Sequence, residues 1–85
     1  MIEPAQIRAA RALLGWRQED LSKAAGVGIA TIRRIESAKS NQTGYVSTIS
    51  RIQTALETAG ILLIDDDGTA GIGVRLTRTK KKKRA

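Results

Sequence analysis

The stretch LGWRQEDLSKAAGVGIATIRRIES, residues 14–37, holds two short helical patterns around a pair of glycines. In residues 18–25 a leucine and two alanines fall on one helical face, and Gly26 follows as a C-terminal stop. A second helix begins at Gly28 or the residue beside it and runs to about Ser37. Gly, Val and Gly between the two helices let them meet closely and at a steep angle, so the stretch predicts a helix-turn-helix.

In the second of these helices, the angular position of each residue predicts whether it faces the core or the solvent. With an advance of about 100° per residue, Ile32 and Ile35 point to the buried side. The outward side holds Ala30, Arg33 and Arg34, with Ile29 at its rim. An arginine fork binds guanine O6 and N7 or grips a phosphate, and a small or branched apolar side chain fits against a thymine methyl. A helix in the major groove of DNA would use these side chains; the alternative is that the two arginines only keep the surface soluble.

Residues 1–60 are predicted to form one helical domain. Pro4 suits the first turn of a helix that covers roughly residues 4–14 and ends before Gly15. After a polar loop, apolar residues at helical spacing mark a fourth helix that Gly60 stops: Val46, Ile49, Ile52, Leu56 and Ala59. The expected fold class is therefore mainly α, with four helices followed by a short β element.

Residues 61–76 change from a helical pattern to a strand pattern. Apolar runs at 61–64 and 72–76 flank Asp-Gly and further glycines, which predicts a strand, a turn and a strand. A two-stranded hairpin is marginal in water, so either the helical domain of the same chain or the same element of a second subunit has to cover it. We favour a dimer, because 60 residues of helices rich in small residues leave limited surface for covering a sheet. The expected dimerisation residues are Ile61, Leu62, Leu63, Ile64, Ile72, Val74 and Leu76.

The triplet Asp65-Asp66-Asp67 before Gly68 invites comparison with a calcium loop. It lacks the alternating acidic spacing and the distal glutamate of an EF-hand, and Asp-Gly is ordinary turn chemistry. We therefore expect no metal site here.

The positive charge is concentrated at the C-terminus. The net charge is +7, and residues 75–85 hold seven of the 15 Lys and Arg residues. Such a balance points to a polyanion, with nucleic acid ahead of an anionic membrane because the end of the chain has no apolar residue beyond Leu76 to insert into lipid. Residues 77–85 are expected to be a disordered basic tail in which Lys80, Lys81, Lys82 and Lys83 contact phosphates without regard to sequence.

The composition excludes several classes of function. The chain has neither Cys nor His, which removes thiol nucleophiles, Ser-His-Asp arrangements and the usual zinc ligands. We expect no enzymatic activity, no cofactor and no small-molecule sensor pocket. Residues 1–10 lack a signal pattern, and the longest apolar run is far too short to span a bilayer, so a cytoplasmic location is expected.

The residues R-x-x-L-G-W-R-Q-E-D-L-S-K-A-A-G-V-G-I-A-T-I-R-R-I-E, 11–36, resemble without a gap the Cro and phage-repressor type of helix-turn-helix, the xenobiotic response element (XRE) family. The resemblance implies a lambda-repressor-like fold, double-stranded DNA as partner, and a bacterial or phage regulator near the nucleoid. By the same resemblance Ile29, Ala30 and Arg34, with Arg33 beside them, read bases. The implied phosphate contacts are Arg17, Gln18, Lys39 and Asn41, and the implied structural ion pair is Arg11 with Glu36.

Two departures limit the resemblance. Ile29 and Ala30 occupy positions where related repressors often carry amides, so hydrogen-bonded base readout would fall mainly on the arginines. The family often dimerises through a fifth helix, which a β element replaces here. The leading hypothesis is a homodimeric repressor on a palindromic site; the alternative is an antitoxin or protein-interaction module that binds a partner protein through the β element. RNA binding is disfavoured because the chain has only two aromatic residues.

Overall fold

The computed structural model describes residues 2–38 and 46–77. Its elements are α1 (Pro4–Leu14), α2 (Gln18–Ala25), α3 (Ile29–Ser37), α4 (Val46–Thr58), β1 (Ile61–Ile64) and β2 (Gly73–Leu76). This order confirms the mainly α fold class with an antiparallel two-stranded hairpin at its end.

Two glycines end the first two helices. Gly15 and Gly26 have φ angles of 69° and 67°, in the left-handed region that glycine enters without steric cost. In that conformation the backbone N–H of Gly26 donates to the carbonyl of Ser22, as does the N–H of Val27. The carbonyl of Ser22 is thereby satisfied within the turn, and the chain changes direction immediately before α3.

The core is built from isoleucine and leucine of all four helices. Each fully buried side chain of this kind stabilises the fold by about 1.5–3 kcal/mol relative to leaving it exposed. The helical members are Ile7, Leu21, Ile32, Ile35, Ile49, Ile52 and Leu56. Of the residues predicted to mark the fourth helix, Ile49, Ile52 and Leu56 lie in the core. Val46 is 67% exposed, and Ala59 lies after the end of α4.

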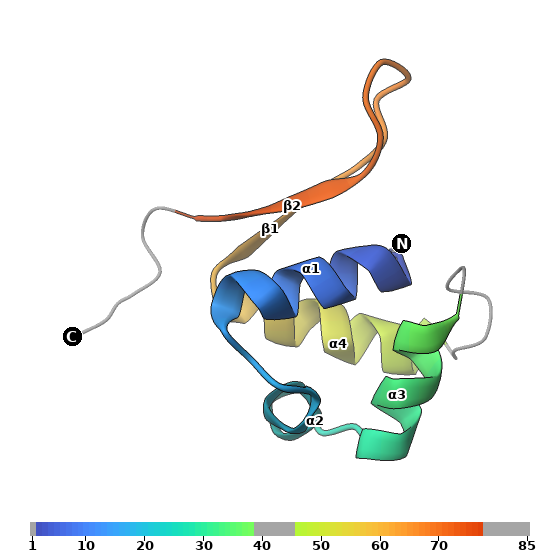
Figure 1. Ribbon diagram of the computed structural model, residues 1–85, viewed down its shortest axis with the longest axis vertical. Helices are drawn as coiled ribbons and strands as arrows, with labels where there is room; N and C mark the ends of the chain where they lie inside the picture. The colour runs from blue at the N-terminus through green and yellow to red at the C-terminus, as the bar shows by residue number, and fades with distance from the viewer. Residues whose placement is uncertain (1, 39–45, 78–85) are drawn as a thin grey trace.

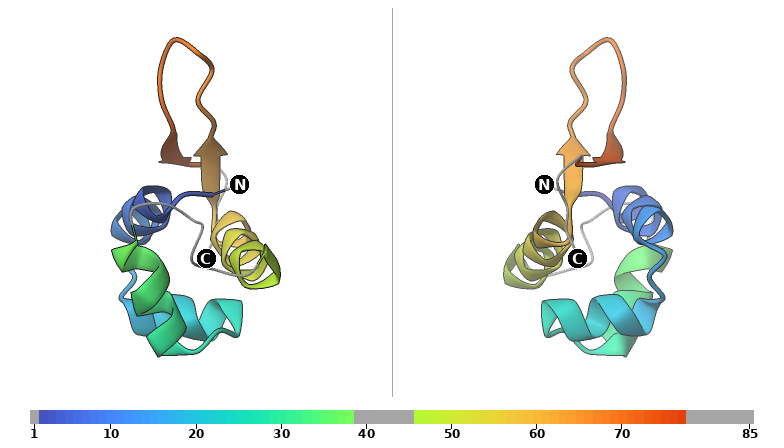
Figure 2. Two further views of the ribbon diagram at one scale, coloured as in Figure 1. Left: turned by 90° about the vertical axis from the view of Figure 1, so that its right-hand side faces the viewer. Right: turned by 90° about the vertical axis from the view of Figure 1, so that its left-hand side faces the viewer.

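Three layers stack along one direction of the molecule. α1 and α4 lie between the hairpin on one side and α2 on the other (Figure 1). The views in Figure 2 show the same order and place the hairpin over α1 and α4 together. The helix-turn-helix and the hairpin thus occupy different sides of the α1–α4 layer.

The hairpin gives one face to the core and the other to solvent. Opposite partners are Ile61 with Leu76 and Leu63 with Val74, and Ile61, Leu63 and Val74 pack on the helical core. Leu62 is 50% exposed and lies on the opposite face. The sequence left two alternatives for covering the hairpin, the helical domain of the same chain or a second subunit. The helical domain covers the inner face, and nothing within the described residues covers the outer face.

The turn of the hairpin is held by its own carboxylates. Asp66 accepts the backbone N–H of Gly68, and Asp67 accepts those of Thr69 and Ala70, each at 2.8 Å. Hydrogen bonds from Ala70 and then Thr69 lower the pKa of Asp67. In the part of the chain that the structure describes, no cluster of three potential metal ligands occurs.

Within the described ranges, no helix combines the length and the apolar character that crossing a bilayer requires.

Candidate nucleic-acid interface

α3 presents a small, basic outward face. Ile32 and Ile35 are 0% and 1% exposed, whereas Ala30, Arg33 and Arg34 are exposed. Ile29, the first residue of the helix, is half-buried at the edge of this face. The angular prediction of which residues point inward and outward therefore agrees with the burial of this helix.

The N-terminus of α2 carries a second basic group. The Arg17 side chain is 79% exposed, and its Nε lies 3.9 Å from Oδ2 of Asp20. That carboxylate also accepts the backbone N–H of Arg17 at 2.8 Å. The exposed guanidinium is therefore only loosely held by Asp20. It lies beside the N-terminus of α2, where the helix dipole favours an anion.

A buried ion pair joins α1 to the end of α3. Arg11 donates from Nε to Oε2 and from Nη2 to Oε1 of Glu36, both at 2.7 Å, and Glu36 is 4% exposed. The hydrogen bond to Glu36 raises the pKa of Arg11. Bidentate geometry of this kind is directional as well as strong, so the pair fixes the C-terminal end of α3 against α1.

The same carboxylate organises two neighbouring groups. Gln18 donates from Nε2 to Oε1 of Glu36 at 3.2 Å, and Arg11 donates from Nη1 to the Trp16 carbonyl at 3.0 Å. Gln18, which is predicted to contact a phosphate, is therefore held by this hydrogen bond to Glu36. The bond links the start of α2 to the C-terminal end of α3.

The structure adds basic residues that the sequence did not single out. Arg8 donates from Nη1 to the backbone carbonyl of Glu36, which adds a second link between α1 and the end of α3. Arg51 of α4 is exposed, and its Nη1 lies 3.5 Å from the Gly26 carbonyl, beside the turn of the helix-turn-helix. Neither contact could be predicted from a local sequence pattern, because the two partners are more than 20 residues apart in sequence.

Some predicted contacts lie outside the described residues. These are Lys39 and Asn41 between α3 and α4, and Lys80, Lys81, Lys82 and Lys83 of the basic tail.

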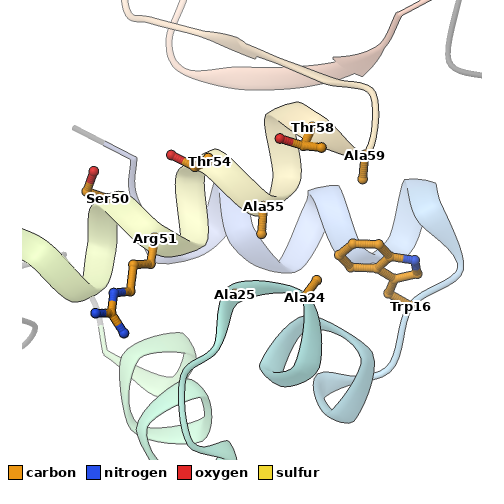
Figure 3. Close-up of a pocket in the computed structure, with 9 residues that line it drawn as sticks. All are labelled: Trp16, Ala24, Ala25, Ser50, Arg51, Thr54, Ala55, Thr58 and Ala59. Carbon is orange, nitrogen blue, oxygen red and sulfur yellow. The ribbon is translucent and has the colours of Figure 1, made fainter.

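A hollow of about 500 Å³ opens between α2 and α4. Figure 3 shows Trp16 at one end, Arg51 toward the other, and Ala24 and Ala55 between them. Its remaining polar residues, Ser50, Thr54 and Thr58, are all exposed at the rim. Ligand sites combine an apolar wall with a few converging polar groups, and this hollow has only the wall. Trp16, which packs on the core, serves here as a structural residue.

A family model described as helix-turn-helix matches residues 7–46, which include most of α1 and all of α2 and α3. Residues 7–46 are a helix-turn-helix domain of the Cro/C1 type, the XRE family. The resemblance on residues 11–36 is thereby confirmed. A comparison with curated proteins finds no match.

The XRE-family domain is a DNA-binding domain, and it implies a part in transcription regulation. Domains of this family are typical of non-enzymatic regulators. The match ends at Val46, the first residue of α4. The rest of α4 and the whole hairpin therefore lie outside it. The family match therefore assigns no function to the hairpin.

Proposed function

We propose that the protein is a sequence-specific regulator of transcription that binds double-stranded DNA as a homodimer and acts as a repressor. The observation that carries the proposal is the exposed face of α3, with two arginines and two small or branched apolar residues, on a DNA-binding domain. Surface helices more often mix acids and bases at pairing distances. A cationic face without acids suits the edges and phosphates of DNA.

The residues have separate roles in this proposal. Arg33 and Arg34 bind base edges or phosphates, and Ile29 and Ala30 contact thymine methyl groups. Arg17, Gln18 and the N-terminus of α2 hold one phosphate, which sets how α3 enters the groove. Because the apolar residues offer no hydrogen bonds, discrimination between sequences rests mainly on the arginines and on DNA shape.

Exposed apolar side chains of residues 61–76 support a dimer. Leu62, Ile64, Ile72 and Leu76 are 50%, 36%, 42% and 38% exposed. These four side chains stay exposed, whereas Ile61, Leu63 and Val74 pack on the helical domain. The proposed dimer interface therefore contains four of the seven residues expected from the sequence. A two-fold dimer would present two α3 helices about 34 Å apart to a palindromic site. Repression would follow from occupying a promoter, in the cytoplasm next to the nucleoid.

Substitution of both arginines tests the proposal. Loss of a bidentate base contact costs about 1–3 kcal/mol, so Arg33→Ala with Arg34→Ala should weaken binding to a selected site at least tenfold. The matched control is Lys23→Ala, which removes one exposed cation from the last turn of α2. Fluorescence anisotropy with labelled duplex gives the affinities, and circular dichroism checks the fold. Equal affinity of the double variant and the wild type would contradict the proposal.

A second candidate is an antitoxin or protein-interaction module. It is favoured by the position of the exposed hairpin residues outside the family match. Sedimentation of the purified protein separates the two candidates, because a homodimer forms without any other chain. A monomer that binds DNA only together with a co-purified partner would favour the second.

A further inference from the structure

Gln6 is the polar side chain that joins the helical domain to the far end of the hairpin. It lies in the first turn of α1 and is 3% exposed. Its Nε2 donates to the carbonyl of Ile64 at 3.1 Å and to the carbonyl of Gly73 at 3.0 Å. Its Oε1 accepts the backbone N–H of Glu3 at 2.9 Å. Both amide hydrogens are therefore used, one on each strand.

The two accepting carbonyls belong to one cross-strand pair. Ile64 and Gly73 face each other at the end of the ladder that is farthest from α4. At the opposite end, Thr77 donates its N–H to the carbonyl of Gly60 at 2.8 Å, where the chain leaves α4. These two points are four residues apart along the strand, a distance of about 13 Å. Fixing a rod at both ends fixes its direction, whereas fixing one end leaves a hinge.

The apolar contacts of the hairpin do not supply the same restraint. Ile61, Leu63 and Val74 pack on the helical core, but hydrophobic burial has no preferred direction and tolerates tilting and sliding. Hydrogen bonds weaken steeply away from good geometry. A buried amide also costs free energy unless it is paired, so an apolar residue would serve equally well if only burial were needed.

We infer that Gln6 sets the distance between the two recognition helices of the dimer by fixing the tilt of the hairpin on its own protomer. The inference rests on the proposed homodimer, in which the hairpin forms the interface. The molecule extends 37 Å along its longest axis, so a tilt of about 10° displaces a distant element by about 3–6 Å, one to two base-pair steps of about 3.4 Å. Gln6 is thus a positioning residue for operator spacing, and it touches no DNA.

The test measures spacing directly. Wild type and Gln6→Met, which keeps the length of the side chain and removes its hydrogen bonds, are each used to select duplexes with two half-sites at varied separation. The wild type should enrich one separation, and the variant should enrich a range spread over two or three base pairs. Affinity for the wild-type site should fall about tenfold in the variant while affinity for a single half-site stays the same.

A matched control removes an amide that lies elsewhere. Gln53 of α4 donates from Nε2 to Oε2 of Glu57, one turn further along the same helix, at 3.3 Å. This bond does not involve the hairpin, so Gln53→Met should keep the single separation. Hydrogen exchange provides a second readout: in Gln6→Met the hairpin amides should lose protection while the amides of α1–α4 keep theirs. If Gln6→Met fails to fold, Gln6→Asn, which is too short to reach both carbonyls, takes its place in both measurements.

The outcomes separate the inference from the proposed function. A variant that selects the same single separation, with unchanged hairpin protection, would overturn the role of Gln6 and leave the dimeric regulator standing. A wild type that is monomeric on DNA or enriches no paired half-sites would overturn the dimer, and with it this role.

Discussion

At the scale of single residues, the buried Glu36 holds α3 against α1 and α2, although it is not itself proposed to touch DNA. One carboxylate receives two bonds from Arg11 and one from Gln18. Three of the α3 residues proposed to touch DNA, Ala30, Arg33 and Arg34, are instead exposed, and exposed side chains usually contribute little to stability. Stability and recognition are therefore assigned to different side chains of one short helix, and they can be changed separately.

Replacing Glu36 should destabilise the protein strongly. Glu36→Ala leaves the Arg11 guanidinium, 20% exposed, without its anion, and breaking a buried pair in this way costs about 3 kcal/mol. Urea unfolding followed by circular dichroism measures the change. Replacing both partners, Arg11→Met with Glu36→Met, should recover most of the loss because no unpaired charge remains. A double variant as unstable as Glu36→Ala would show that the pair is not the cause.

Two glycines in one turn should respond differently to alanine. Gly26 has a φ angle of 67°, so Gly26→Ala forces an L residue into the left-handed region at a cost of about 1–2 kcal/mol. Gly28 has a φ angle of -59° and open space where a Cβ would go, so Gly28→Ala should change stability by less than about 0.5 kcal/mol. Thermal unfolding of the two variants compares them. Equal losses would contradict the assigned backbone conformations.

At the scale of elements, local signals predicted what lies close in sequence. Glycines and apolar spacing placed the four helices, because the caps and the core face of a helix depend on residues three or four apart. Gln6 has only a capping signal, three residues after Glu3; its hairpin partners are 58 and 67 residues away. Contacts between residues this far apart in sequence leave no local pattern. For this reason the sequence did not predict which hairpin side chains pack on the core and which remain exposed.

The hairpin turn should lose its hydrogen bonds in acid. The pKa of Asp67 is lowered by the N–H groups of Ala70 and Thr69, so the carboxylate favours the ordered turn at pH values above its ordinary value of about 3.9. This contribution is lost as the pH falls through the lowered pKa. A carboxyl titration by NMR should show a midpoint below the ordinary value, with the Thr69 and Ala70 amide shifts moving together with it. A midpoint at or above the ordinary value would contradict the turn geometry.

At the scale of the whole molecule, the proposal divides three tasks among three parts. α3 selects sequence, the hairpin joins two copies, and the basic residues at the C-terminus raise affinity for any DNA. The first two lie on different sides of the α1–α4 layer (Figure 1). This separation is what allows the hairpin to set spacing without touching a base.

Removing the basic tail should change salt dependence and leave the preferred site unchanged. A variant ending at Thr77 keeps the bond from Thr77 to Gly60 and loses six basic residues. Each phosphate contact contributes about 0.9 to the slope of log affinity against log salt, so the slope should fall by up to about 5. Titrations at several salt concentrations measure it. A changed preferred site would assign sequence selection to the tail as well.

The most direct test of the central claim is selection of random duplex DNA by the full-length protein at near-physiological salt. A dimeric, sequence-specific regulator predicts enrichment of an inverted repeat whose half-sites lie about one helical turn apart. Retention of DNA with no enriched sequence would contradict it, because binding would then come from charge alone.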